Sequence, residues 1–70
     1  MSCIKNFIDK IEEEITVDLN NFEPIDNEGW EMEGSVVYKG KEHNVYLNAR
    51  FEDSLERQAA LSIADDLLKS

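Results

Sequence analysis

The stretch WEMEGSVVYKGKEHNVYLNARF, residues 30–51, alternates apolar and polar side chains on both sides of a central Lys-Gly-Lys. Such alternation is typical of strands that bury one face and expose the other. Gly40-Lys41 suits a two-residue type II′ turn, because glycine would occupy the first central position. The stretch therefore predicts a β-hairpin in which Lys39 lies opposite Glu42.

Counting outward from this turn predicts the cross-strand partners. One face pairs Tyr38 with His43, Val36 with Val45, Gly34 with Leu47, Met32 with Ala49, and Trp30 with Phe51. The other face pairs Val37 with Asn44, Ser35 with Tyr46, Glu33 with Asn48, and Glu31 with Arg50. Turn chemistry and patterning agree in this register, and a one-residue slip would destroy both. We therefore expect Trp30 and Phe51 in the core, and Val37 and Tyr46 on the outer face.

A helix and a further strand are predicted before the hairpin. Apolar residues at helical spacing predict a helix that is capped by Ser2 and ends near Glu14. The alternating stretch ITVDLN, residues 15–20, predicts a strand. Residues 20–29, which include Pro24, are expected to form a long connection.

The stretch DSLERQAALSIADDLLK, residues 53–69, predicts a final helix. Asp53 is its expected N-cap, with Glu56 completing a variant of the capping box. Its expected buried stripe is Leu55, Ala59, Ala60, Ile63, Ala64 and Leu67, with Leu61 and Leu68 at the margin. Residues 1–70 are thus expected to form one α+β domain: a helix, a three-stranded antiparallel meander and a helix (α-β-β-β-α). We expect both helices on one face of the sheet.

The length and the single cysteine limit the functions open to this chain. With 70 residues, its core must take up nearly all the large apolar side chains, which leaves little room for a buried catalytic cleft. Cys3 cannot form an internal disulfide, so a reducing compartment is expected. The sequence has no membrane-length apolar run and no apolar signal region near Met1, so we expect a cytoplasmic protein.

The net charge of −9 is unevenly distributed. Residues 1–33 contain ten acids and two bases, whereas residues 34–70 contain six acids and five bases. The negative net charge argues against direct binding of nucleic acid, because a protein binds the phosphates through lysine and arginine. It favours a partner with a basic surface.

Acids that outnumber the nearby bases predict two candidate binding patches. Five carboxylates fall within EPIDNEGWEME, residues 23–33, and charge that breaks local rules without compensation tends to mark function. The first predicted patch consists of Asp18, Asp26, Glu28, Glu31 and Glu33. The second consists of Glu12 and Glu13, at the negative end of the first helix. Tyr46 is a further candidate contact, because the outer face gives it no packing role.

Catalytic and metal chemistry are poorly supported. His43 is the only histidine, and no motif places a nucleophile beside it. One cysteine and one histidine cannot form a structural zinc site. The stretch DNEG, residues 26–29, lacks the alternating acids and the terminal glutamate of a calcium loop. We expect no enzymatic activity, no metal and no cofactor.

The element order resembles that of the double-stranded-RNA-binding domain. QAALSIADDLL, residues 58–68, is similar to the alanine-rich second helix of that family. The family binds phosphates through lysines at the start of this helix, where the present sequence has Asp53, Ser54, Leu55, Glu56 and Arg57. The resemblance therefore implies a protein–protein adaptor or a homodimerisation module that has lost RNA binding.

The stretch CIKNFIDKIEEEITVDL, residues 3–19, is similar to the start of one family of small acidic phage anti-CRISPR proteins. Those inhibitors of type II nucleases build a three-stranded sheet beside helices and present carboxylates to a nucleic-acid-binding groove. The resemblance implies a non-enzymatic nucleic-acid mimic that acts on a CRISPR complex in the host-cell cytoplasm. This function and the adaptor remain two alternatives at the level of sequence.

Overall fold

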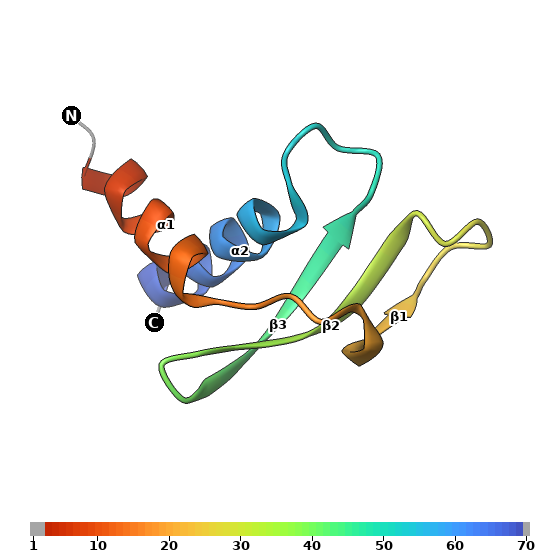
Figure 1. Cartoon of the computed structure of the whole chain (residues 1–70), viewed down its shortest axis with the longest axis horizontal. Helices are drawn as coiled ribbons and strands as arrows, with labels where there is room; N and C mark the ends of the chain where they lie inside the picture. The colour runs from red at the N-terminus through yellow and green to blue at the C-terminus, as the bar shows by residue number, and fades with distance from the viewer. Residues whose placement is uncertain (1–2, 70) are drawn as a thin grey trace.

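The structure, a computed structural model, describes residues 3–69 as one sheet with helices before and after it (Figure 1). The strands are antiparallel and lie in the order β1-β2-β3. The elements are α1 (Cys3–Glu14), the 3-10 helix η1 (Leu19–Asn21), β1 (Phe22–Pro24), β2 (Glu31–Tyr38), β3 (Lys41–Asn48) and α2 (Leu55–Lys69). This order confirms the predicted α-β-β-β-α fold. Ser2 and the side chain of Cys3 lie outside what the structure describes.

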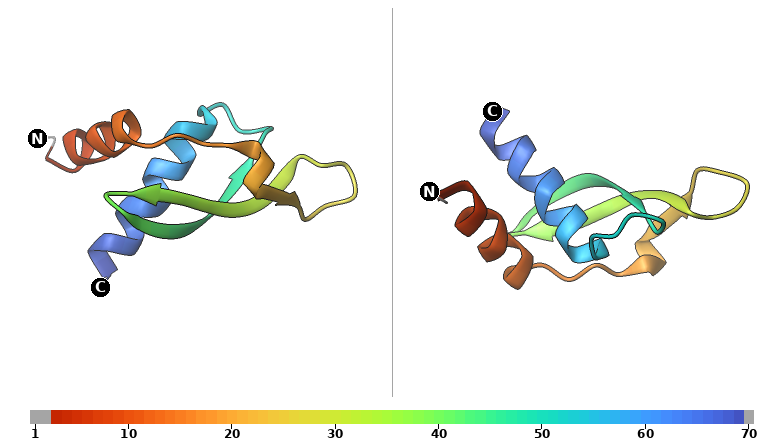
Figure 2. Two further views of the ribbon diagram at one scale, coloured as in Figure 1. Left: turned by 60° about the horizontal axis from the view of Figure 1, so that its bottom comes forward. Right: turned by 90° about the horizontal axis from the view of Figure 1, so that it is seen from above.

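One apolar core joins both helices to the inner face of the sheet. α2 lies along β3, and α1 packs mainly against α2 (Figure 2). The buried apolar residues are Ile8, Ile11, Ile15, Val36, Tyr38, Val45, Leu47, Ala59, Ala60, Ile63 and Ala64. Neither α1 nor α2 covers the opposite face, where every second side chain stays exposed or half-buried.

The turn between β2 and β3 lies one residue earlier than predicted. Its central residues are Lys39 and Gly40, with φ angles of 51° and 80°, and Tyr38 lies opposite Lys41. Positive φ at both central positions defines a type I′ turn, so the predicted type II′ turn is wrong. Every predicted partner on β3 shifts by two residues. The two faces keep their predicted side chains because side-chain direction alternates with a period of two.

Replacing Lys39 by asparagine should stabilise the hairpin. A residue other than glycine pays a steric cost at positive φ, and asparagine before glycine is a preferred type I′ pair. We expect Lys39→Asn to raise the free energy of unfolding by about 1 kcal/mol in urea titrations. Lys41→Asn, just after the turn and without a positive φ, is the matched control. An unchanged stability of Lys39→Asn would contradict a conformational cost at this position.

The first strand lies later in the chain than predicted. Residues 15–18 form no strand, and Asp18 instead caps η1. Its side chain accepts a hydrogen bond from the backbone N–H of Asn20 (3.0 Å), and its carbonyl accepts one from that of Asn21 (2.9 Å). Local bonding by an aspartate side chain thus competes with strand formation. The strand that pairs with β2 is β1, within the predicted connection.

Glycine at position 34 allows β1 to approach β2 closely. Phe22 is the partner of Gly34, and its ring packs against the core. A Cβ atom on Gly34 would lie 2.6 Å from both the ring Cγ of Phe22 and the carbonyl oxygen of Asn21. Any larger residue would therefore displace β1.

The prediction that Trp30 and Phe51 pair in the core is wrong. Their side chains are 42% and 58% exposed. Because the pairing shifts by two, the carbonyl of Trp30 accepts a hydrogen bond from the N–H of Ala49, and Phe51 lies in the turn that follows. Tyr38, which is 7% exposed, supplies the large aromatic ring of the core instead.

The start of α2 also differs from the prediction. The hydroxyl of Ser54, rather than the side chain of Asp53, accepts a hydrogen bond from the N–H of Arg57 (3.1 Å). The predicted stripe is buried or half-buried, and Leu61 and Leu68 are exposed. Gln58 is a buried polar residue that the apolar pattern does not indicate.

Candidate protein-binding face

The uncovered side of the sheet is acidic along its length. Its side chains come from alternate residues of the three strands, which point away from the helices. They are Glu23, Glu31, Glu33, Ser35, Val37, Glu42, Asn44, Tyr46 and Asn48, which together we call the outer face. Four of the nine are carboxylates, and none is lysine or arginine.

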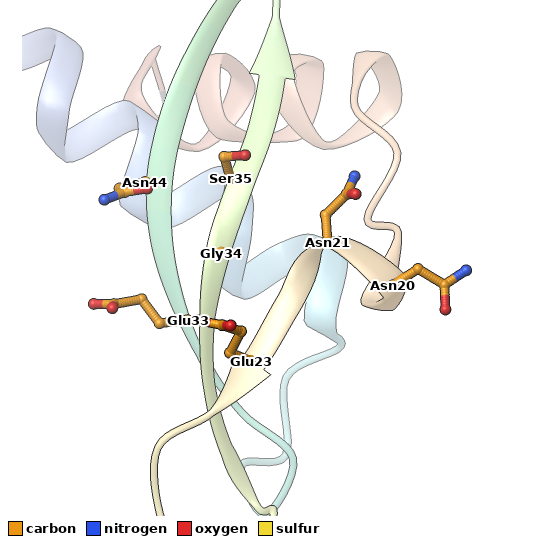
Figure 3. A pocket seen from close by; sticks show the side chains of 7 residues that line it. All are labelled: Asn20, Asn21, Glu23, Glu33, Gly34, Ser35 and Asn44. Carbon is orange, nitrogen blue, oxygen red and sulfur yellow. The ribbon is translucent and has the colours of Figure 1, made fainter.

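Glu23 and Glu33 lie directly opposite each other on β1 and β2. Both line a hollow of about 370 Å³ together with Asn20, Asn21 and Asn44, whose side chains extend in different directions (Figure 3). Neither carboxylate forms a hydrogen bond or an ion pair with any of residues 3–69. Like charges directly opposite each other destabilise a sheet, and here no base offsets the repulsion. Carboxylates and amide oxygens together suit an ammonium or guanidinium group.

Tyr46 and Glu31 join β2 and β3 on the same face. The hydroxyl of Tyr46 donates a hydrogen bond to Oε1 of Glu31 at 2.6 Å. This bond is the main reason why the pKa of Tyr46 is raised, and partial burial and the negative charge of Glu31 raise it further. The phenol therefore stays protonated to higher pH than a free tyrosine. The prediction that Glu31 lies opposite Arg50 is wrong, because its partner on β3 is Asn48.

Removing the charge of Glu31 should lower the pKa of Tyr46. A raised folded-state pKa means that the bond stabilises the fold below pH about 10 and is lost as the pH rises through the raised value. We expect Glu31→Gln to shift the alkaline midpoint of the Tyr46 ring resonances downward in an NMR titration. Glu33→Gln is the matched control, because Glu33 lies opposite Tyr46 without bonding to its hydroxyl. Equal shifts in both variants would contradict a role for the hydrogen bond.

Arg50 neutralises part of the first predicted patch. Its Nη2 donates to Oε1 of Glu28 at 2.7 Å, and its guanidinium carbon lies 5.0 Å from the centre of the Trp30 ring. A guanidinium at this distance from an indole ring forms a cation–π contact. The expectation that Glu28 lacks a base is therefore wrong.

Two further members of that patch have structural roles. Asp18 caps η1, and Oδ1 of Asp26 accepts hydrogen bonds from the N–H groups of Gly29 (2.7 Å) and Glu31 (3.3 Å). These bonds hold the loop between β1 and β2. Of the five predicted acids, only Glu31 and Glu33 lie on the outer face.

The second predicted patch lies on α1 and is partly compensated. Glu12 and Asp9 both accept hydrogen bonds from Nη1 of Arg57 in α2. The bond to Asp9, followed by the bond to Glu12, raises the pKa of Arg57. Glu13 is exposed and lines a hollow of about 220 Å³ with Asp9 and Glu12. Arg57, the one base in the first turn of α2, thus makes an internal contact.

Sequence reasoning did not include Glu23 and Glu42 among the candidate binding residues of the outer face. Glu23 belongs to the face only because β1 begins at Phe22 rather than at Ile15. Glu42 lies on this face in both registers, but the predicted register pairs it with a base, Lys39, whereas its observed partner is Val37. The alternation of Phe22, Glu23 and Pro24 was the available signal, but a proline within three residues is a weak indication of a strand.

The buried His43 has a structural partner. It lies opposite Val36 rather than Tyr38, is 3% exposed, and places Nδ1 2.9 Å from Oδ2 of Asp66 on α2. Within residues 3–69, no group of three or more histidine, cysteine, aspartate or glutamate side chains could hold a metal ion. Neither α1 nor α2, the helices that the structure describes, is long and apolar enough to cross a membrane.

Comparisons with models of known protein families, with curated proteins and with solved structures found no match for this chain. The structure defines the class as a small acidic α+β domain with one uncovered sheet face. The geometry of that face is therefore the basis for a functional proposal.

Proposed function

We propose that this protein is a non-enzymatic inhibitor that binds the basic, nucleic-acid-binding groove of another protein or complex. Carboxylates of the outer face would take the place of phosphates. The observation that carries the proposal is the uncompensated pair Glu23 and Glu33 on an uncovered face. Lysine or arginine side chains of a partner would donate charge-assisted hydrogen bonds to both carboxylates and so offset their mutual repulsion.

Two exposed apolar residues on the same face support a protein partner. Val37 is 54% exposed and Tyr46 is 43% exposed. Tyrosine is enriched at the centre of protein interfaces because it combines a large apolar ring with a polar hydroxyl. The face thus combines apolar contact area with the acidic groups that would select a basic surface.

A CRISPR effector complex is the target that we propose to test first. Such complexes hold the guide and target strands in a positively charged channel, which an acidic face could occupy. The similarity of residues 3–19 to one family of anti-CRISPR proteins adds support from the sequence. Binding in the channel would exclude nucleic acid and block cleavage.

A tagged pulldown from bacterial lysate tests this proposal. We expect a nucleic-acid-binding complex to be retained at about 50 mM salt and released at higher salt, since contacts between charges are screened. Duplex DNA added to the retained complex should displace the bait. A partner that stays bound in high salt, or that DNA does not displace, would contradict mimicry.

The exposed Val37 and Tyr46 also favour a second candidate, a protein–protein adaptor or homodimer. For this function, Tyr46→Ala should abolish binding, and Glu33→Gln should have little effect. A homodimer through the outer face would bring four carboxylates from each copy together without a base on either face. We therefore expect a monomer in sedimentation experiments at low salt. A stable low-salt dimer would favour the second candidate.

A further inference from the structure

A cavity of about 360 Å³ lies at the turn end of the β2–β3 hairpin, on the side of the helices. α1 and the C-terminal half of α2 lie near this turn (Figure 1). The lining residues are Phe7, Tyr38, Lys39, Lys41, His43 and Leu67, which together form what we call the hairpin cavity. Its volume lies in the lower part of the range of about 300–1,000 Å³ that small-molecule sites occupy.

The hairpin cavity combines apolar walls with two cations that have no ionic partner. Phe7, Tyr38 and Leu67 supply the apolar surface. Neither Lys39 nor Lys41 forms an ion pair within residues 3–69, although the chain contains 16 acids and only seven bases. Nζ of Lys39 lies 5.6 Å from the centre of the Tyr38 ring, so the charge stays beside the apolar wall.

His43 adds a polar ring to the lining of the same cavity. Its side chain is 2% exposed, and Nδ1 is held by Asp66 at 2.9 Å. Within the described part of the chain, Nε2 has no hydrogen-bond partner, and the ring itself lines the cavity. No buried side-chain nitrogen or oxygen of the described residues lacks a hydrogen-bond partner, so Nε2 is within reach of solvent and is open to a ligand atom in the cavity.

The backbone conformation of Lys39 is a further argument for a ligand site. Its φ of 51° lies in the left-handed region, where asparagine or glycine would cost less. Local strain is often retained at positions that bind a ligand. A lysine at this position places an amine at the mouth of the hairpin cavity despite the conformational cost.

We propose that the hairpin cavity binds a small amphipathic anion. An aromatic ring or a short acyl chain would lie against Phe7, Tyr38 and Leu67. A single carboxylate would lie between Lys39 and Lys41, which favour negative charge in a region where the rest of the protein repels it. This site does not depend on the outer face, because its lining residues belong to the inner face, the turn and the helices.

An NMR titration of the ¹⁵N-labelled full chain with sodium octanoate tests the proposal. We expect saturable shift changes confined to the amides of the lining residues. Lys41→Glu and Lys39→Glu should each weaken binding about tenfold or more, the size of effect that one charge-assisted contact produces. Lys10→Glu on α1, an exposed lysine outside the cavity with the same charge change, is the matched control and should bind normally.

Two further probes separate the apolar and ionic parts of the site. Octanamide, which keeps the chain without the charge, and inorganic phosphate, which keeps a charge without the chain, should both bind much more weakly than octanoate. Equal binding by octanamide or by phosphate would overturn the proposal. So would non-saturable shifts, or an equal loss of affinity in Lys10→Glu.

In Lys39→Asn, a loss of octanoate binding cannot be explained by misfolding of the turn. It should raise stability, as argued above, and lower the affinity for octanoate. A variant that is more stable and binds octanoate as tightly as the native chain would contradict a ligand role for Lys39.

Discussion

Replacing Gln58 by methionine lowers the free energy of unfolding by about 2–4 kcal/mol, because it leaves buried backbone groups without partners. Oε1 of Gln58 accepts a hydrogen bond from the N–H of Asn48 at 2.8 Å. Nε2 donates to the carbonyl oxygens of Asn48 and Asp53, both at 3.0 Å. Methionine keeps the approximate volume and removes all three bonds.

The geometry explains why one amide has so large an effect. Hydrogen-bonded and non-bonded pairs alternate along antiparallel strands, and Ala49 bonds to Trp30 across the sheet. The backbone groups of Asn48 therefore point away from β2, toward the edge of the sheet. Gln58, which is 8% exposed, bonds to both of these groups as a neighbouring strand would. It thereby links α2 to the end of β3.

Chemical denaturation of Gln58→Met measures the loss, and Gln58→Glu is the matched control. Glutamate keeps the acceptor for the N–H of Asn48 but loses both donors, so we expect an effect of similar sign. Hydrogen exchange at the Asn48 amide should accelerate much more in Gln58→Met than in Gln58→Glu. A domain of this size is stabilised by only about 4–10 kcal/mol, so the denaturant concentration at the midpoint of unfolding will change by a large fraction. An unchanged midpoint in Gln58→Met would contradict this role.

Sequence patterning predicts the fold because its main signals tolerate small errors. The hairpin turn is misplaced by one residue, yet Val36, Val45 and Leu47 still face the core. An even shift in pairing preserves the faces, whereas an odd shift would exchange them. The end of α1 near Glu14 is predicted from the change to an alternating pattern after it, and the structure confirms that end.

The candidate site is less predictable, because it depends on which residues lie directly opposite each other. Shifting the register by two moves Glu31 from Arg50 to Asn48. Arg50 then pairs with Glu28 instead, which no local pattern indicates. The position of β1 depends on the turn that Asp18 caps and on the absence of a side chain at Gly34. The periodicity of the sequence predicts neither the turn that Asp18 caps nor the close approach of β1 to β2 at Gly34.

Neutralising Glu23 and Glu33 together should have opposite effects on stability and on binding. In the isolated protein, Glu23→Gln/Glu33→Gln removes a like-charge pair and should raise the free energy of unfolding by about 0.2–1 kcal/mol. Affinity for a partner captured in the pulldown should fall roughly a hundredfold or more, because two charge-assisted contacts are lost. The salt dependence of binding should become less steep. Calorimetry or fluorescence anisotropy at several salt concentrations measures the affinity and its salt dependence.

Glu12→Gln/Glu13→Gln is the control that separates position from net charge. It changes the net charge by the same amount on α1, which packs against α2 rather than bordering the outer face. If the outer face is the binding surface, this variant keeps most of its affinity. If both double variants lose affinity equally, overall charge rather than the outer face drives association. If only Tyr46→Ala loses affinity, the contact is apolar and the adaptor explains the protein better than mimicry of nucleic acid.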